Sequence, residues 1–302
     1  MCQFCDACAS NERVNTTMYG TDAADLLVGG SLTDYIYGNE GNDSLSGHGG
    51  DDFIFGGEGN DSVLGGNGDD YLSGDSAFTD PNSSSNDTLR GGNGNDEIFG
   101  GFGEDSLYGG NGNDRMFGGL GRDRLFAGQG DDYVNGNEGN DTLFGNGGND
   151  TLFGGDGLDG DADLLVAGDG DDSLVGGLDN DTLNGGAGND RFVFSGSRAF
   201  AEAGLGIDRI QDFGNGNDKI VLDRRVFAGI SGGNDSPLSE SDFAVVSSNA
   251  AAAIADALIV YNSNNGRLYY NENGSSNGFG EGGEFAILNA QPDLVTADFA
   301  VA

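Results

Sequence analysis

Apolar residues in the middle of the chain recur at an interval of nine. From Leu27 through Leu45 to Phe192, one apolar residue stands between two variable neighbours, and the six residues before it are polar and rich in glycine. In an extended chain the middle side chain of three points one way and its neighbours the other. The pattern therefore predicts a very short strand in each copy, with the position-eight side chain buried and a sharp turn before the next strand.

The nine-residue frame reads Gly, Gly, any, Gly, any, Asp, any, apolar, any, as in GGEGNDSVL from Gly56 and GGNGNDEIF from Gly91. It can be followed from Gly20 to Val193 as eighteen copies, each with Asp at position six. Such a period indicates a stacked repeat array. Glycines at positions one, two and four permit positive φ and close backbone approach, so six residues can turn while their carbonyl oxygens point inward.

Those carbonyl oxygens and the position-six carboxylates predict an all-oxygen metal site. Calcium accepts six to eight flexible oxygen ligands, whereas magnesium prefers a smaller octahedron with bound waters. His48 is the one histidine in the chain and stands at position two, so the repeats cannot assemble a histidine-based transition-metal site. The predicted calcium ligands are Asp25, Asp34, Asp43, Asp52, Asp61, Asp70, Asp87, Asp96, Asp105, Asp114, Asp123, Asp132, Asp141, Asp150, Asp163, Asp172, Asp181 and Asp190, with Gly57, Gly59, Gly66, Gly68, Gly92, Gly94, Gly101, Gly103, Gly110, Gly112, Gly119, Gly121, Gly128, Gly130, Gly155 and Gly157.

These nonapeptides resemble the repeats-in-toxin (RTX, hemolysin-type) family, most of all its bacterial and cyanobacterial members. The resemblance covers residues 20–193 and implies an all-β fold, a parallel β-roll with two nonapeptides in each coil. It also implies that each Ca²⁺ lies between turns of repeats two apart on the same edge. Eighteen repeats then allow about sixteen such pairs, and we expect about 10–16 bound calcium ions.

Charge and core size suggest that this segment folds only with metal. The chain carries 51 acidic and 12 basic residues, a net charge of -39. So much like charge opposes a compact state unless cations neutralise it, and it argues against nucleic acid or an anionic membrane as partner. One apolar residue in nine cannot offset the conformational entropy of a chain with 59 glycines. We expect residues 20–193 to be largely disordered without calcium, so that binding energy becomes folding energy.

Beyond the repeats, residues 194–302 have a different sequence pattern, without the nine-residue period. RFVF at 191–194 and IDRIQDFGNGNDKIVL at 207–222 predict strands, a helix is expected near Asn249–Ala257, and GRLYYNENG at 266–274 has a hairpin pattern. We expect a mainly-β capping domain with a short helix. The DF..G.DKI and GRLYY segments are similar to regions that flank the repeats in this family.

The chain is expected to leave the cell by type I secretion. Its last residues, DLVTADFAVA, resemble the uncleaved export signal of that pathway. No apolar run approaches the roughly 20 residues that span a bilayer, and the first thirty residues lack a signal-peptide pattern. The N-terminal tail, residues 1–19, contains Cys2, Cys5 and Cys8, for which intermolecular disulfides, a lipid or metal role and an unstructured tail all stay open.

Departures from the frame mark further candidates. Position four is Ala23, Leu32 and Asp179 in the outer repeats, which predicts imperfect end sites. Insertions of eight residues around 78–84 and four around 158–161 fall in one alternate series, either as a recognition edge or as tolerated turns. Position nine predicts outward aromatic ladders that dock a partner, a second copy or the C-terminal segment, or only fill the strands; the rings concerned are Tyr108, Phe126 and Phe144 in one series and Phe99 and Phe117 in the other.

Little in the sequence supports catalysis. A single histidine excludes an HExxH zinc site, and GISGG around Ser231 matches GxSxG without a strand–elbow–helix context. Calcium-bound carboxylates have lowered pKa values and are not poised as general acids. We expect a secreted, non-catalytic calcium-binding protein with a structural or adhesive role at the cell surface or in the matrix, with surface polysaccharide or self-association as partners. A calcium buffer or sensor, an accessory repeat module of an extracellular enzyme, and a polymer subunit joined end to end are the alternatives.

Overall fold

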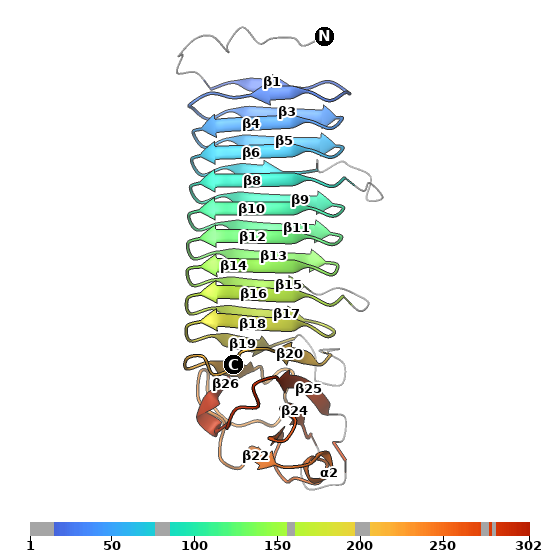
Figure 1. The fold of residues 1–302 in the computed structure, drawn as a ribbon, viewed down its shortest axis with the longest axis vertical. Coiled ribbons are helices and arrows are strands. Elements are labelled where there is room, and N and C mark those ends of the chain that lie inside the picture. Colours follow the sequence, from blue (N-terminus) through green and yellow to red (C-terminus); the bar gives the residue numbers. More distant parts are fainter. Residues whose placement is uncertain (1–14, 76–84, 156–160, 197–205, 273–277, 280–281) are drawn as a thin grey trace. The chain divides into compact units, whose positions relative to one another are not determined.

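The computed structural model describes residues 15–75, 85–155, 161–196, 206–272, 278–279 and 282–302. The chain forms two compact units, Met1–Asp150 and Thr151–Ala302. In both, almost all of the regular secondary structure is β-strand (Figure 1). The repeats continue into the second unit, and the predicted division at residue 194 stays a prediction. Among the described residues, no helix is long and apolar enough to cross a membrane.

The first unit is a stack of coils in which successive strands alternate between two parallel sheets (Figure 1). Each strand pairs with the strand two places on, as Leu107 does with Leu125, so one coil consumes eighteen residues, or two nonapeptides. One sheet contains β1 (Thr17–Tyr19), β3 (Tyr35–Glu40), β5 (Phe53–Glu58), β7 (Tyr71–Ser73), β9 (Glu97–Phe102), β11 (Arg115–Leu120) and β13 (Tyr133–Glu138). The other contains β2 (Leu26–Val28), β4 (Ser44–Gly49), β6 (Ser62–Asn67), β8 (Thr88–Asn93), β10 (Ser106–Asn111), β12 (Arg124–Gln129) and β14 (Thr142–Gly147).

Most of these strands are twice as long as the sequence predicted. A typical strand such as β10 has six residues and covers positions seven to nine of one copy and one to three of the next. Pairing continues across the glycines, because Gly110 aligns with Gly128 and Asn111 with Gln129. The turn is therefore only positions four to six, and it too bonds to the next coil through Gly112 N–H and the Gln129 carbonyl, 2.8 Å apart. This satisfies backbone groups that a six-residue turn would leave without partners.

The glycines of the frame serve two separate purposes. Gly118, at position one, has ordinary φ, but a Cβ there would lie 2.4 Å from Asp123 Oδ2 and 2.6 Å from the Gly136 carbonyl oxygen. Gly110, at position two, has φ of 125°, which side-chain-bearing residues rarely adopt. Position one thus needs glycine for close approach, and position two for its backbone conformation.

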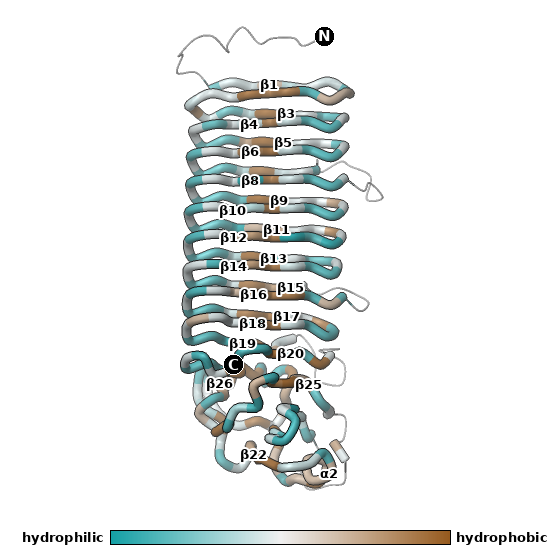
Figure 2. The backbone as a smooth tube through the Cα atoms, viewed as in Figure 1, coloured by the Kyte–Doolittle hydropathy of each residue, from teal (hydrophilic) through white to brown (hydrophobic). Residues whose placement is uncertain are grey.

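The core of the first unit is one side chain wide. Position-eight residues such as Ile98, Leu107 and Met116 are fully buried between the two sheets. They form the apolar band along the middle of each strand in Figure 2, flanked by polar turns. Each coil therefore contributes only two core side chains, which confirms the predicted burial and the thinness of the core.

In the second unit the parallel strand pairing continues beyond the last repeat. Non-repeat strands continue it in parallel, with Leu183 opposite Ile210 and Phe192 opposite Ile220, before an antiparallel group follows. One sheet contains β15 (Thr151–Gly155), β17 (Ser173–Gly177), β19 (Arg191–Phe194), β21 (Lys219–Leu222) and β26 (Phe299–Val301). The other contains β16 (Leu164–Asp169), β18 (Thr182–Ala187), β20 (Asp208–Ile210), β25 (Gly283–Leu288), β24 (Arg267–Tyr270), β23 (Ile259–Asn262) and β22 (Phe243–Val246).

The predicted helix is shorter than expected. The structure has α2 at Asn249–Ala252, capped by the Ser248 side chain, and a 3-10 turn, η2, at Thr296–Asp298. The helix stops because nearby carbonyls bond elsewhere: that of Ala253 accepts from Gly278 N–H, and that of Ala255 accepts from the Asn271 side chain. The parallel β-solenoid and the mainly-β C-terminal segment are confirmed.

We predict that Leu107→Ala destabilises the calcium-loaded protein by about 2–5 kcal/mol. It removes a fully buried side chain from a core that is only one side chain wide, and this leaves a cavity. Leu64→Ala is the matched control, since Leu64 is 41% exposed at position nine, and it should change stability by less than about 0.5 kcal/mol. Urea denaturation in excess calcium measures both. Equal effects would contradict the assignment of position eight as the core.

Candidate metal centre

The position-six aspartates of the first unit form two columns, one along each edge of the sheets. The first column contains Asp25, Asp43, Asp61, Asp87, Asp105, Asp123 and Asp141. The second column contains Asp34, Asp52, Asp70, Asp96, Asp114, Asp132 and Asp150. Almost all of these side chains are buried, so the repeat aspartates are brought together as the sequence predicted.

One carboxylate oxygen of each aspartate links consecutive coils. The backbone N–H of Asp87 donates to Asp105 Oδ1 at 2.7 Å, and the N–H of Asp105 donates to Asp123 Oδ1 at 2.8 Å. The same link recurs down both columns at 2.7–2.9 Å. From Asp34 in one column and Asp43 in the other, each Oδ1 is thus used by the fold itself.

The other oxygen, Oδ2, is buried without a hydrogen-bond partner among the described residues. This holds for Asp43, Asp52, Asp61, Asp70, Asp87, Asp96, Asp105, Asp114, Asp123, Asp132 and Asp181. A buried charge without a partner costs several kcal/mol, so proteins normally pair it or use it to bind a cation. The same unpartnered oxygen in successive repeats indicates a ligand that binds in each of them.

Carbonyl oxygens face the turns from the adjoining coils, and one lies close to Asp105 Oδ2. A Cβ placed on Gly100 would be 2.5 Å from Asp105 Oδ2 and 2.4 Å from the carbonyl oxygen of Gly118, one coil on, so both oxygens face the same glycine. The carbonyl oxygens of Gly92 and Gly94 face the next coil in the same manner, 2.1 Å and 1.9 Å from where Gly110 and Gly112 would carry a Cβ.

Each turn therefore supplies one carboxylate and several carbonyls. Within the part of the chain that the structure describes, no three His, Cys, Asp or Glu side chains group closely enough to hold a metal ion. An oxygen-only donor set of low charge fits a hard cation such as calcium and not zinc or iron. The predicted ligand Gly157 lies outside the described residues, as do Cys2, Cys5 and Cys8.

Burial raises the pKa of these carboxyls. It raises the pKa of Asp105 to about 9 and that of Asp87 to about 8, with neighbouring carboxylates adding to the shift and the coil-linking N–H bonds opposing it. The pKa of Asp52 rises to about 7 for the same reasons. The lowered pKa expected of calcium ligands is thus the reverse of what the protein alone produces, because burial without a cation penalises the charged form.

The first aspartate of each column differs from the inner ones. Asp34 Oδ2 accepts from Gly30 N–H at 2.6 Å, and Asp25 Oδ2 accepts from both the N–H and the hydroxyl of Thr21. The pKa of Asp25 is accordingly lowered, chiefly by its bond to the Thr21 backbone. These are the repeats whose position four is Ala23 and Leu32, so two of the three predicted departures coincide with carboxylates that the protein already partners. The third does not, because Asp181 Oδ2, in the repeat with Asp179, has no hydrogen-bond partner among the described residues.

Two further aspartates of the second unit, Asp208 and Asp218, continue the pattern of the position-six aspartates, although they lie outside the nine-residue frame. Asp208 Oδ1 accepts from Asp181 N–H, and Asp218 Oδ1 accepts from Asp190 N–H, both at 3.1 Å. Burial raises the pKa of Asp208 well above its usual value. The signal was present, because Gly206–Ile210 and Gly216–Ile220 repeat positions four to eight of the frame, but the missing first glycines hid it.

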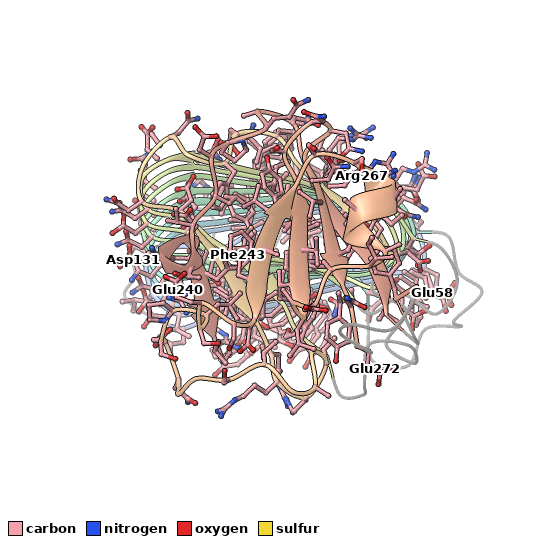
Figure 3. All side chains as sticks on the ribbon, turned by 90° about the horizontal axis from the view of Figure 1, so that it is seen from below. Glu58, Asp131, Glu240, Phe243, Arg267 and Glu272 are labelled. Carbon is pink, nitrogen blue, oxygen red and sulfur yellow. The ribbon has the colours of Figure 1, made fainter. Side chains whose placement is uncertain are left out.

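Position five, which is variable in the nine-residue frame, forms a second row of hydrogen bonds between coils. Asn113 Oδ1 accepts from Asp131 N–H at 3.0 Å, and Asp131 Oδ1 accepts from Asn149 N–H at 2.8 Å. Most copies have Asn or Asp there, which was the available signal. These side chains face solvent at the outside of the turns, as Asp131 does in Figure 3.

Comparison with known families agrees with this geometry. The model of the RTX calcium-binding nonapeptide repeat matches residues 19–54, 46–77, 83–116, 90–125, 108–143, 126–161 and 158–192. These matches cover more than half of the chain, which therefore belongs to this family, and its repeats bind Ca²⁺. No curated protein matches the chain.

We predict that acid partly substitutes for calcium. A carboxyl whose pKa is higher in the folded than in the unfolded state stabilises the fold below its unfolded pKa, and this contribution is lost as pH rises through the folded pKa. With folded values of about 6 to 9, metal-free protein should gain β structure on acidification from pH 9 towards pH 5. Far-ultraviolet circular dichroism in a chelator measures this. An unchanged spectrum would show that the buried carboxylates do not limit folding.

Proposed function

We propose that this is a secreted, non-catalytic protein that folds when calcium binds outside the cell and serves as a structural or adhesive component of the cell surface or matrix. The observation that supports this most directly is the repeated buried Oδ2 without a partner. A segment built in this way is stable only where calcium is plentiful. Low cytoplasmic calcium then keeps it unfolded for export.

The proposed ligands are the position-six carboxylates and the carbonyl oxygens of the glycines at positions two and four. In the first column, Asp105 Oδ2 would bind together with carbonyls of neighbouring turns, and the same set recurs in each coil. Calcium supplies the positive charge that offsets the desolvation of each carboxylate. Because Oδ1 holds the preceding coil, occupancy of one site orders the residues that form its neighbour.

Export before folding agrees with the place of the last residues. Phe299 and Val301 of β26 are buried and pair with Ile220 and Leu222 of β21. A secretion machine that reads this segment would have to engage it before β26 joins the sheet. We therefore propose that type I export acts on the calcium-free chain, whose C-terminal strand is free.

A continuous aromatic stripe on the first unit supports an adhesive role. Consecutive ring centroids lie 5.0–5.8 Å apart, and Tyr19, at one end, is 68% exposed. The stripe consists of Tyr19, Tyr37, Phe55, Tyr71, Phe99, Phe117 and Tyr133, all on the sheet that begins with β1. The other sheet has a shorter stack of Tyr108, Phe126 and Phe144. The other rings are half-buried, and each leaves part of its surface to solvent. A contiguous apolar row of this kind is typical of interaction sites, whereas a calcium buffer does not require it.

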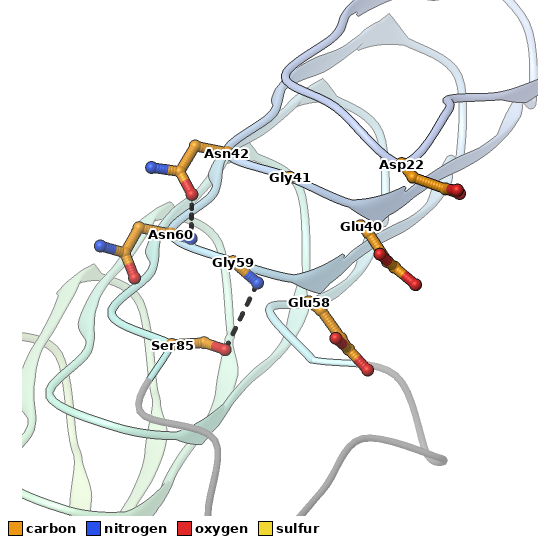
Figure 4. A pocket seen from close by; sticks show the side chains of 8 residues that line it. All are labelled: Asp22, Glu40, Gly41, Asn42, Glu58, Gly59, Asn60 and Ser85. Carbon is orange, nitrogen blue, oxygen red and sulfur yellow. Dashed lines mark hydrogen bonds between the residues drawn. The ribbon is translucent and has the colours of Figure 1, made fainter.

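Acidic side chains beside this stripe limit the choice of partner. The carboxylates of Asp22, Glu40 and Glu58 stand in a row along a shallow pocket of the first unit (Figure 4). They would repel a polyanion. A neutral surface polysaccharide is the partner we favour, with self-association as the second candidate. The inserted residues 78–84 and 158–160 lie outside the described residues, so the recognition edge stays a prediction.

Ser231, the one residue that matched a catalytic motif, has a local structural explanation. Its N–H donates to Asp242 at 2.8 Å, and its hydroxyl also donates to the same carboxylate. These bonds lower the pKa of Asp242. The hydroxyl is thus committed to a carboxylate that closes a loop, which supports the non-catalytic reading.

We predict that far-ultraviolet circular dichroism of the chelator-treated protein shows a cooperative rise of β signal with calcium and none with magnesium. Asp105→Asn removes one buried carboxylate and should shift the midpoint to higher calcium by several-fold. Asp131→Asn is the matched control, since it removes the same charge from an exposed side chain and should leave the midpoint unchanged. Equal responses of the two variants would refute the ligand assignment.

We also predict that replacing Phe55, Phe99 and Phe117 together by Ser reduces retention of calcium-loaded protein on a neutral-polysaccharide resin by about tenfold or more. Loss of three stacked rings removes apolar contact area worth about 1 kcal/mol or more for each ring. Leu64→Ser, on the opposite sheet, is the control. Unchanged retention with a loss of light-scattering particles would favour self-association, and no change in either would overturn an adhesive stripe.

A further inference from the structure

Asp75 departs from the repeat frame in a way that neither the family nor the frame explains. It occupies position two, where the adjoining first-column turns have Gly57 and Gly101, and it is the one carboxylate at that position among the eighteen copies. It is also only 5% exposed. A buried extra charge in an array that already buries one carboxylate in each turn needs a compensating interaction.

Three contacts fix the orientation of this residue. Asp75 Oδ2 accepts from Phe102 N–H at 2.6 Å, and the Ser73 hydroxyl donates to the Asp75 carbonyl at 2.6 Å. The carboxylate lies against Gly101, where a Cβ would be 2.4 Å from Oδ2. It is therefore held between the turn that contains Asp87 and the next turn of the same column.

Part of this arrangement is structural. Strand β7 ends at Ser73, earlier than the six-residue strands around it, and Asp75 Oδ2 supplies the acceptor for Phe102 N–H at that point. That bond, and a hydrogen bond from the Ser85 side chain to the same carboxylate, leave one oxygen over. Asp75 Oδ1 is buried and has no hydrogen-bond partner among the described residues, the same state as Oδ2 of the repeat aspartates.

The surroundings of Asp75 are strongly negative. Its carboxylate adds to the burial effects that raise the pKa of Asp87 to about 8 and of Asp105 to about 9. Its own pKa is raised by burial first, with Glu58 adding to the shift and the bonds from Phe102 and Ser85 opposing it. Glu58 and Ser85 also line the shallow pocket of Figure 4.

We propose that Asp75 Oδ1 is an additional calcium ligand in the first column, at the turn closed by Asp87, and makes this the first site of the array to fill. Calcium affinity rises with the number of charged ligands, and this site would have one carboxylate more than a regular turn. The inference rests on the proposed ligand role of the position-six aspartates. It goes beyond that role by ranking one site above the others and naming the residue responsible.

The test is isothermal titration of calcium chloride into the full-length, chelator-treated protein. Asp75→Asn keeps an acceptor for Phe102 N–H but removes the charge, so it should abolish the tightest binding phase or weaken it by about tenfold or more. Asp131→Asn, with the same change in net charge at an exposed position, should keep that phase. The wild-type protein should show the phase at about one ion per chain.

Each other outcome is also decisive. If the Asp75→Asn and Asp131→Asn isotherms coincide, Asp75 serves only the strand ladder and the proposal fails. If neither variant nor the wild type binds calcium, the calcium columns themselves fail, which is a different result. Should Asp75→Asn not fold in saturating calcium, Asp75→Gly restores the frame and must show the same loss of the tight phase, with Asn39→Gly as its control at position two. Retention of that phase in Asp75→Gly would overturn the assignment.

Discussion

The structure depends on the different roles of the two oxygens in each repeat carboxylate. One oxygen accepts the backbone N–H of the aspartate one coil earlier, which fixes the spacing of the coils. That bond draws the side chain inside the turn, where the second oxygen is buried without a partner. The interaction that builds the array thus also creates its need for a cation, because the same burial that shapes the turn penalises the charge it contains.

This constraint explains why so thin a core suffices. Each coil buries only two apolar side chains, such as Ile98 and Leu107, which is far less than an ordinary domain of this length provides. We propose that metal binding supplies the missing stability, which couples folding to the calcium concentration.

Once the coils are set, their surfaces are repetitive as well. Any residue at positions seven or nine is copied into a row about one strand spacing apart, so a few aromatic substitutions produce a stripe such as that from Tyr19 to Tyr133. The turns produce rows of Asn, Asp and Glu in the same way. A departure such as Asp75 can therefore be compared directly with the residues at the same position in the neighbouring coils.

The sequence alone determined the features that are local to one nonapeptide. The period, the buried position-eight residue and the preference for calcium all follow from residue types repeated every nine positions. The parallel roll, which places the aspartates in columns, came from the family resemblance. What depends on atoms from different coils was decided only by the tertiary structure. The six-residue strands, the distinct roles of Oδ1 and Oδ2, the continuation through Asp208 and Asp218 and the burial of Asp75 all arise from backbone groups that meet across eighteen or more residues. No pattern within a single repeat contains that information, because hydrogen-bond partners and desolvation are properties of the stacked coils.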